Sequence, residues 1–177
     1  MPRGSGGDPS LLTMNSIRDG AVESKMMQLL NKAVAEEEAS HVEFLLRNGA
    51  KPREEHLNRS VLKKDADMVQ VLLLADSDGT IFSKAFRQTT LLVALRLGSC
   101  PDVVAKLLRR DVGKVNPTFC SDDKNKEFPL HLAVKELEVV RLLLTHGADA
   151  NPRNALGDTP LHMVENNATV ARLFLDY

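Results

Sequence analysis

Histidine and cysteine carry most of the reactive chemistry that this sequence could offer, so their spacing is the first test of function. His131 and His162 each follow a Pro-Leu pair, but no H-E-x-x-H, Cys-x-x-Cys or carboxylate cluster supplies the other ligands of a metal ion. Neither Cys100 nor Cys120 has a histidine or a Gly-rich turn beside it, and no G-x-S-x-G occurs. The sequence therefore predicts no metal, no cofactor and no enzyme.

Composition excludes further classes of function. Charged residues make up 27% of the 177 residues and leave a net charge of −1, whereas a sequence-independent nucleic-acid binder needs an excess of Lys and Arg. No apolar run approaches the roughly 20 residues of a membrane span. The chain has only two cysteines, which do not indicate a disulfide framework, so we expect a reducing compartment, the cytoplasm or the nucleus.

An internal repeat explains the apolar residues. FPLHLA at 128–133 and TPLHMV at 159–164 are two copies of one segment, and each is followed by a six-residue apolar block. Five such blocks occur along the chain, namely HVEFLL at 41–46, MVQVLL at 68–73, VVAKLL at 103–108, VVRLLL at 139–144 and VARLFL at 170–175. If the residues of each block are numbered one to six, positions two, five and six are apolar in every block. This i, i+3, i+4 spacing places the three side chains on one face of a helix.

A partner segment precedes each block and has a leucine three residues before a small or apolar residue. The pairs are Leu30/Ala33, Leu57/Ser60, Leu91/Ala94, Leu130/Ala133 and Leu161/Val164. Small residues in the second column allow two helices to approach closely, because a bulky side chain there would overpack the contact. The sequence predicts five units of helix, tight turn and helix.

The letters TPLH at 159–162 resemble the ankyrin repeat, whose helix-opening signature is T-P-L-H-x-A on a period of about 33 residues. The resemblance extends over residues 24–177, by motif in the last two units and by register in the first three. It implies an all-α solenoid of stacked antiparallel helix pairs with projecting hairpin loops. We expect a disordered leader at 1–13, an N-terminal capping segment at 14–23, and repeats at about 24–53, 54–79, 80–116, 117–153 and 154–177. The connection at 51–55 is short, so the first hairpin should be reduced.

The same resemblance assigns structural roles. His131 and His162 would hydrogen-bond locally and tie a first helix to the neighbouring hairpin. Asn116 and Asn151 would organise hairpin turns, and in some members of the family this asparagine is hydroxylated. Phe128 stands where the family has threonine, so that repeat lacks its capping hydroxyl.

The resemblance implies a non-enzymatic module that binds another protein through a concave face of loops and first helices. The chain would be monomeric unless the partner is a second copy. We place these residues on the binding face: Arg59, Phe82, Phe86, Arg87, Arg96, Asp122, Asp123, Lys124, Arg153, Leu156, Asp158 and Glu165. For Phe82 and Phe86 two interpretations remain open, namely anchors for a partner and local packing.

Other interpretations of the whole chain also remain open. It could be a regulatory or targeting domain of a larger enzyme or channel, because the last repeat keeps apolar residues at 174 and 175 where a terminal repeat needs a polar face. It could instead be a small autonomous inhibitor of a partner protein. The basic residues at 47–64 leave two alternatives open. They could belong to a solvated face of mixed charge, or they could form a basic strip that binds an acidic peptide.

Overall fold

The structure is a computed structural model that describes residues 9–76, 79–98, 100–109 and 128–177, with side chains described from residue 20 onward. Its elements are α1 (Pro9–Ala35), α2 (Ala39–Arg47), α3 (Glu54–Leu62), α4 (Ala66–Ala75), α5 (Lys84–Arg96), α6 (Pro101–Leu108), α7 (Pro129–Ala133), α8 (Leu137–Thr145), the 3-10 helix η1 (Pro160–Met163) and α9 (Ala168–Leu175). No strand occurs within the described ranges. The expected all-α fold is confirmed.

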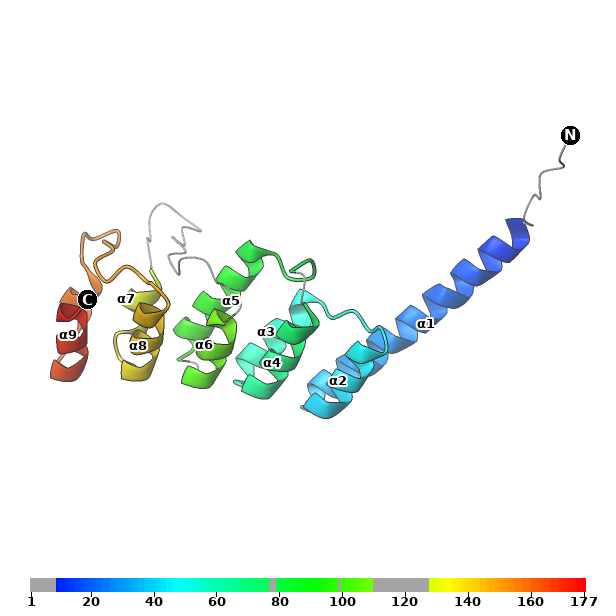
Figure 1. Cartoon of the computed structure of the whole chain (residues 1–177), viewed down its shortest axis with the longest axis horizontal. Helices are drawn as coiled ribbons and strands as arrows, with labels where there is room; N and C mark the ends of the chain where they lie inside the picture. The colour runs from blue at the N-terminus through cyan, green and yellow to red at the C-terminus, as the bar shows by residue number, and fades with distance from the viewer. Residues whose placement is uncertain (1–8, 77–78, 99, 110–127) are drawn as a thin grey trace, which may run out of the picture.

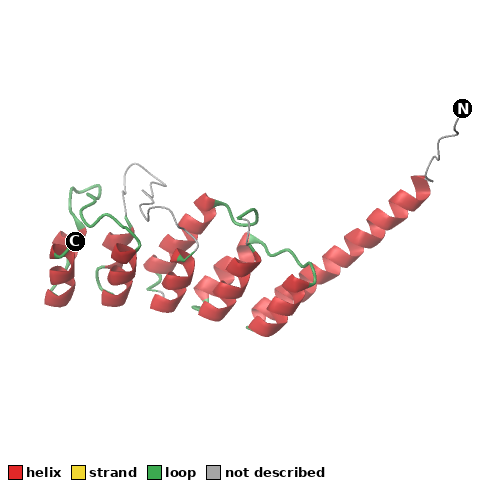
Figure 2. Ribbon diagram, in the orientation of Figure 1, coloured by secondary structure: helices red, strands yellow, loops and turns green. Residues whose placement is uncertain are grey.

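The helices form two parallel rows. In the first row α1, α3, α5, α7 and η1 contact one another in order, and in the second row α2, α4, α6, α8 and α9 do the same. α1, α3, α5 and α7 also pack on the second-row helix that follows each of them in the chain, so the molecule is an elongated stack (Figures 1 and 2). The loops after α4 and α8 project to the same side of this stack (Figure 1).

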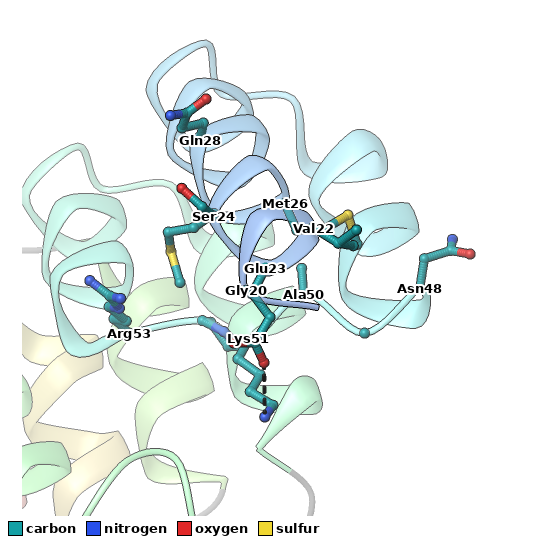
Figure 3. A pocket seen from close by; sticks show the side chains of 13 residues that line it. Gly20, Val22, Glu23, Ser24, Met26, Gln28, Asn48, Ala50, Lys51 and Arg53 are labelled. Atoms are coloured by element: carbon teal, nitrogen blue, oxygen red, sulfur yellow. Dashed lines mark ion pairs between the residues drawn. The ribbon is translucent and has the colours of Figure 1, made fainter. Parts of the chain in front are cut away.

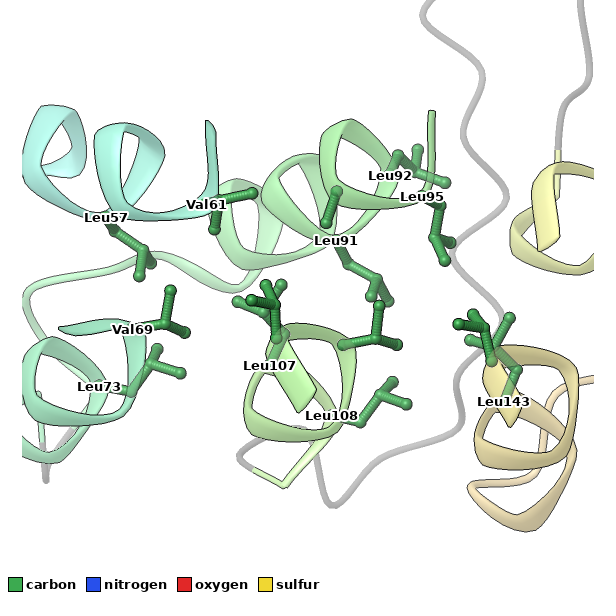
Figure 4. Close-up of a cluster of buried hydrophobic side chains, with 14 of the residues drawn as sticks. Leu57, Val61, Val69, Leu73, Leu91, Leu92, Leu95, Leu107, Leu108 and Leu143 are labelled. Carbon is green, nitrogen blue, oxygen red and sulfur yellow. The ribbon is translucent and has the colours of Figure 1, made fainter. Parts of the chain in front are cut away.

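The predicted apolar stripes meet between the rows. Leu57 and Val61 of α3 face Val69 of α4, and the same layer continues through Leu107 to Leu143 of α8 (Figure 4). All of these side chains are buried. Because burying one aliphatic side chain contributes about 1.5–3 kcal/mol, the layer rather than any single helix accounts for the stability of the stack.

Four of the five tight turns between paired helices, all except the turn between α7 and α8, pass through a left-handed residue. Glu37, Lys64 and Asn166 have φ values of 61°, 58° and 49°, and Gly98 has 58°. Glycine adopts this conformation without steric cost, whereas other residues pay about 1–2 kcal/mol. Three of these turns are therefore strained positions that the surrounding helices hold in place.

Lysine side chains tie successive turns together. Lys63 Nζ donates to Glu37 Oε1 at 2.6 Å and to the carbonyl of Ala35 at 3.0 Å. Lys64 Nζ donates in the other direction, to the carbonyl of Gly98 at 2.9 Å. The turns after α1, α3 and α5 are thus connected along one edge of the stack.

Other basic side chains of this region are also paired within the chain. Arg47 lies 2.6 Å from Glu43, and Lys51 lies 3.7 Å from Glu23. Together with the Lys63 contact, these pairs support the mixed solvated face rather than a basic strip that is free to take an acidic peptide.

The N-terminal region differs from the expectation. α1 is continuous from Pro9 to Ala35, so residues 9–13 form its first turns instead of belonging to a leader, and residues 14–23 are its middle rather than a separate segment. Its N-terminal half extends away from the stack (Figure 1).

The last repeat also departs from the expected pattern. Its first helix is the four-residue 3-10 helix η1, because Val164 turns into extended backbone at φ −76° and ψ 103°. In α9 the buried residues are Val170 and Phe174, whereas Ala171 is half-buried and Leu175 is exposed. Positions two and six of this block are therefore not buried, whereas positions two, five and six are buried in α4, α6 and α8.

Candidate functional site

The hairpin loop between α4 and α5 is folded around one buried carboxylate. Asp76 has no exposed surface, and its carboxylate accepts the backbone N–H of Ile81 at 2.8 Å and of Phe82 at 3.3 Å. Arg87 Nη1 donates to the same carboxylate at 3.1 Å and to the carbonyl of Phe82 at 2.8 Å. A buried ion pair with this many hydrogen bonds holds the loop in one conformation.

Two predicted contact residues of this loop have structural roles. Phe82 is completely buried, so it belongs to the core and is not a surface contact, which corrects its placement on the binding face. Its ring lies 5.9 Å from that of Phe86, which is half-buried at the start of α5. Arg87 is half-buried and holds the loop through Asp76. The sequence signal that was missed is an aspartate directly after a helix, with backbone N–H groups a few residues later to bind it.

The hairpin between α8 and η1 is organised by Asn154. Its Oδ1 accepts the N–H groups of Leu156 and Asp158, both at 2.9 Å, and its own N–H donates to the carbonyl of Asp158 at 2.9 Å. Gly157, at φ 85°, donates to the carbonyl of Asn154 at 3.0 Å, and Arg153 Nη1 donates to the carbonyl of Gly157 at 2.8 Å. This network leaves Leu156 at the tip, 85% exposed.

Asn151 does not organise this turn. Its N–H donates to Asp149 Oδ1 at 2.9 Å, and its position is exposed. The turn depends on Asn154 instead, and the signal in the sequence is an asparagine three residues before a glycine. Asn116, the other predicted turn asparagine, lies outside the described residues.

Both histidines of the repeated segment make the expected local hydrogen bonds, but only His131 ties its helix to a neighbouring hairpin. The His131 ring donates through Nε2 to the carbonyl of Asp158 at 2.9 Å, so it ties α7 to the next hairpin. His162 Nδ1 accepts the N–H and the hydroxyl of Thr159, at 3.3 and 2.7 Å. Phe128 replaces that threonine before α7 and offers a ring 5.6 Å from His131, whose Nδ1 has no hydrogen-bond partner among the described residues.

His56 has the same capping role, which the sequence register did not reveal. It follows Arg53 by three residues, as His162 follows Thr159, and its Nδ1 accepts the Arg53 N–H at 2.8 Å. Nε2 therefore carries the proton and donates to Asn31 Oδ1 of α1 at 2.6 Å. Burial lowers the pKa of His56 below its usual 6.5, against the opposing effect of Glu55.

The remaining predicted contact residues lie on several elements. Arg59 on α3, Arg96 in the last turn of α5 and Glu165 after η1 are exposed. Arg153, Leu156 and Asp158 come together in one hairpin. Asp122, Asp123 and Lys124 lie outside the described residues. Leu62 at the end of α3 and Leu97 directly after α5 are also exposed, and the repeat pattern did not single them out because it assigns only the apolar positions of the stripe.

A hollow of about 600 Å³ lies between α1 and the connection to α3 (Figure 3). It exists because this connection is only the six residues 48–53, which confirms the reduced first hairpin. Its ionisable side chains are Glu23, Lys51 and Arg53, and the first two form an ion pair. The hollow contains no nucleophile next to a base and no pair of carboxylates, so these residues do not indicate a reaction.

The described ranges also bear on metal binding and on membrane insertion. No group of three His, Cys, Asp or Glu side chains there is arranged to hold a metal ion. Among the helices of the same ranges, none combines the length and the apolar character that crossing a membrane requires.

Comparison with known proteins agrees with this geometry. The family model described as ankyrin repeats in three copies matches residues 57–154 and, again, residues 91–177. The chain belongs to the ankyrin repeat family. Ankyrin repeats are generally protein–protein interaction modules and are typically not enzymes. The resemblance recognised from TPLH is thus confirmed at the level of the family.

A curated relative of this ankyrin chain is alpha-latrotoxin-Lg1a of Latrodectus geometricus. The two sequences are 31% identical over 132 residues, which is 69% of this chain and 9% of the relative. The ankyrin chain therefore spans less than a tenth of the length of the curated relative that it matches.

Proposed function

We propose that this ankyrin chain binds a partner protein through its projecting hairpins and the adjacent exposed side of the first-row helices. The observation that carries the proposal is Leu156, whose side chain is 85% exposed on a turn that five backbone and side-chain hydrogen bonds hold. Moving an exposed apolar side chain from water into a partner's pocket lowers the free energy of the complex. A turn that is already rigid loses little conformational entropy on binding.

Arginine side chains are exposed in this hairpin and on other helices of the first row. Arg153 lies in the same hairpin, and Arg59 and Arg96 are exposed on first-row helices. Leu62 and Leu97, at 59% and 45% exposure, add apolar surface in that row. Leucine beside arginine suits a partner segment with an apolar side chain flanked by carboxylates or backbone carbonyls.

The test is quantitative affinity capture with the whole chain and two leucine variants. Leu156→Ser should reduce the recovery of specific partners several-fold, because the anchor is removed while the turn hydrogen bonds, which use the backbone of residue 156, remain. Leu74→Ser is the control for the last hairpin: Leu74 is 62% exposed on α4 of the second row, outside the hairpin between α8 and η1 that carries Leu156. Equal recovery with both variants, or a loss with Leu74→Ser alone, contradicts the proposal.

A second candidate is that the chain acts as one binding segment of a longer protein. The match to a stretch amounting to 9% of a much longer relative favours it. An antibody raised against residues 128–177 and used on an extract of the source cells distinguishes the two. A band at 19.5 kDa, the mass of this chain, supports the autonomous module, and a much larger band supports the second candidate.

A further inference from the structure

The connection between α2 and α3 leaves part of α1 open. Residues 48–53 make this connection, whereas the corresponding connections further along the chain comprise residues 76–83 and 146–159. The hollow of about 600 Å³ between α1 and residues 48–53 is the consequence (Figure 3). Its volume lies within the range of hollows that hold a ligand.

This hollow is a short trough with two walls. One wall is α1 between residues 20 and 28, and the other is the connection at 48–53. At 1.5 Å per residue the helical wall is about 12 Å long, which matches about three to four residues of extended chain. Glu23 and Lys51 form an ion pair of 3.7 Å from one wall to the other (Figure 3). Both side chains are largely exposed, so this pair contributes little and opens easily.

The helical wall of the trough is apolar and adaptable. Val22 is 59% exposed on it, and Met26 and Met27 are half-buried. Pro52, which is buried, lies in the opposite wall. Methionine side chains are unbranched and flexible, so they pack against apolar side chains of different shapes. The trough can therefore accept an apolar side chain without a fixed outline.

Arg53 gives the trough an uncompensated positive charge. Its side chain is exposed, and among the described residues the guanidinium has no ion pair and no hydrogen bond. Glu54 and Glu55 follow it in the first turn of α3, but neither forms an ion pair with it. Lys51, the other basic residue of the lining, is already paired with Glu23. A free guanidinium binds a carboxylate through two parallel hydrogen bonds, so Arg53 selects an occupant that carries one.

The backbone of the connection adds a further binding element. The N–H groups of residues 48–50 donate to carbonyls of α2. Within the described part of the chain the N–H and the carbonyl of Lys51 have no such partner. An extended peptide can hydrogen-bond to free main-chain groups of this kind, whatever its side chains are. The trough thus suits a peptide segment better than a compact anion.

We infer that this trough binds a short extended segment of a partner protein, with one carboxylate on Arg53 and a nearby apolar side chain against Met26 and Met27. One arginine sets the charge requirement, so the segment needs a single carboxylate and not an acidic run. The trough lies at the opposite end of the stack from the hairpin that carries Leu156 (Figure 1). Binding here therefore does not depend on that hairpin.

The test is selection of random peptides displayed on phage against the whole chain, followed by fluorescence anisotropy of the enriched peptides. Enriched peptides should combine Asp or Glu with an apolar residue a few positions away. Arg53→Gln should weaken their binding about tenfold or more, because the charge-assisted pair is lost. Met27→Gln should weaken it several-fold. Arg59→Gln is the matched control, since Arg59 is exposed on the same helix but does not line the trough, and it should leave the affinity unchanged.

A second substitution, made in the peptide, assigns the carboxylate to Arg53. Replacing the acidic residue of the peptide by its amide should weaken binding to the wild type as much as Arg53→Gln does, and it should have no further effect on the Arg53→Gln variant. All variants change exposed or half-buried side chains, so they should keep the wild-type melting curve.

Leu156→Ser should bind these peptides as the wild type does, so a failure here is distinguishable from a failure of the hairpin proposal. Three results overturn the inference: no peptide is enriched, no enriched peptide carries a carboxylate, or Arg53→Gln and Arg59→Gln have equal effects on every enriched peptide.

Discussion

Three histidines at the starts of first-row helices show how much depends on single residues. His162 caps its own helix, and His131 hydrogen-bonds the next hairpin. His56 caps its own helix by accepting the Arg53 N–H and also joins a neighbouring helix by donating to Asn31 of α1. The arrangement at His56 requires the neutral ring, because Nδ1 must accept a hydrogen bond. A proton on Nδ1 would turn that acceptor into a second donor facing a donor.

This predicts a pH dependence of stability. The folded state holds the pKa of His56 below 6.5, so at slightly acidic pH the unfolded chain binds more protons than the folded one. The free energy of unfolding should be independent of this group above about pH 7 and should fall as the pH drops through 6.5 toward the lower folded pKa. Urea unfolding at several pH values should show this fall. His56→Gln should have a smaller slope over the window, and parallel curves would contradict the assignment.

At the scale of the elements, each helix pair is too short to be stable alone. α7 has five residues and η1 has four, whereas isolated helices in water are marginal below about 12–15 residues. Their helical state therefore depends on the stripe that they share with α8, α9 and the neighbouring pairs. The apolar stripe stabilises the fold where a neighbouring helix buries it, and it contributes little where it is exposed to solvent.

Leu143 and Leu175 test this dependence. Leu143→Ala should destabilise the chain by about 2–5 kcal/mol, because Leu143 is fully buried in α8 and truncation leaves a cavity. Leu175→Ala should change the free energy of unfolding of the monomer by less than about 0.5 kcal/mol, since its side chain is largely exposed. Denaturant unfolding at low protein concentration measures both. A Leu143→Ala loss as small as that of Leu175→Ala would mean that the stripe is not buried.

For the whole molecule, stability is a sum over neighbouring contacts along one axis. α4 and α6 have second-row neighbours on both sides, whereas α9 contacts α8 alone in its row. In such a stack the ends open at lower free energy than the middle, because opening an end breaks one contact surface instead of two.

Hydrogen exchange should reveal this gradient. Amide protection should be greatest in α4 and α6 and least in α9 and in the N-terminal half of α1, which extends from the stack. Equal protection of all helices would contradict a one-dimensional stack.

The positions that could be predicted from the sequence are those that every repeat must share. Stacked helix pairs need an apolar stripe with helical spacing and a small residue at the close approach, so Leu57, Leu91 and Leu130 identify the core without coordinates. TPLH at 159–162 identifies the family, and its copy FPLH at 128–131 predicts the role of His131 for the same reason. These constraints act within each repeat and recur along the chain. Several weakly matching repeats in the same register therefore support one assignment.

Other features depended on contacts between segments that no repeat pattern specifies. Asp76 binds Arg87 only after the loop between α4 and α5 has folded back, and this buries Phe82, which the sequence alone places equally well on the surface. Asn154 rather than Asn151 holds the last hairpin, because the geometry of that turn decides which side chain reaches two N–H groups. The stripe itself follows from the sequence, but whether Leu175 is covered depends on a neighbouring helix, which only the tertiary arrangement can supply.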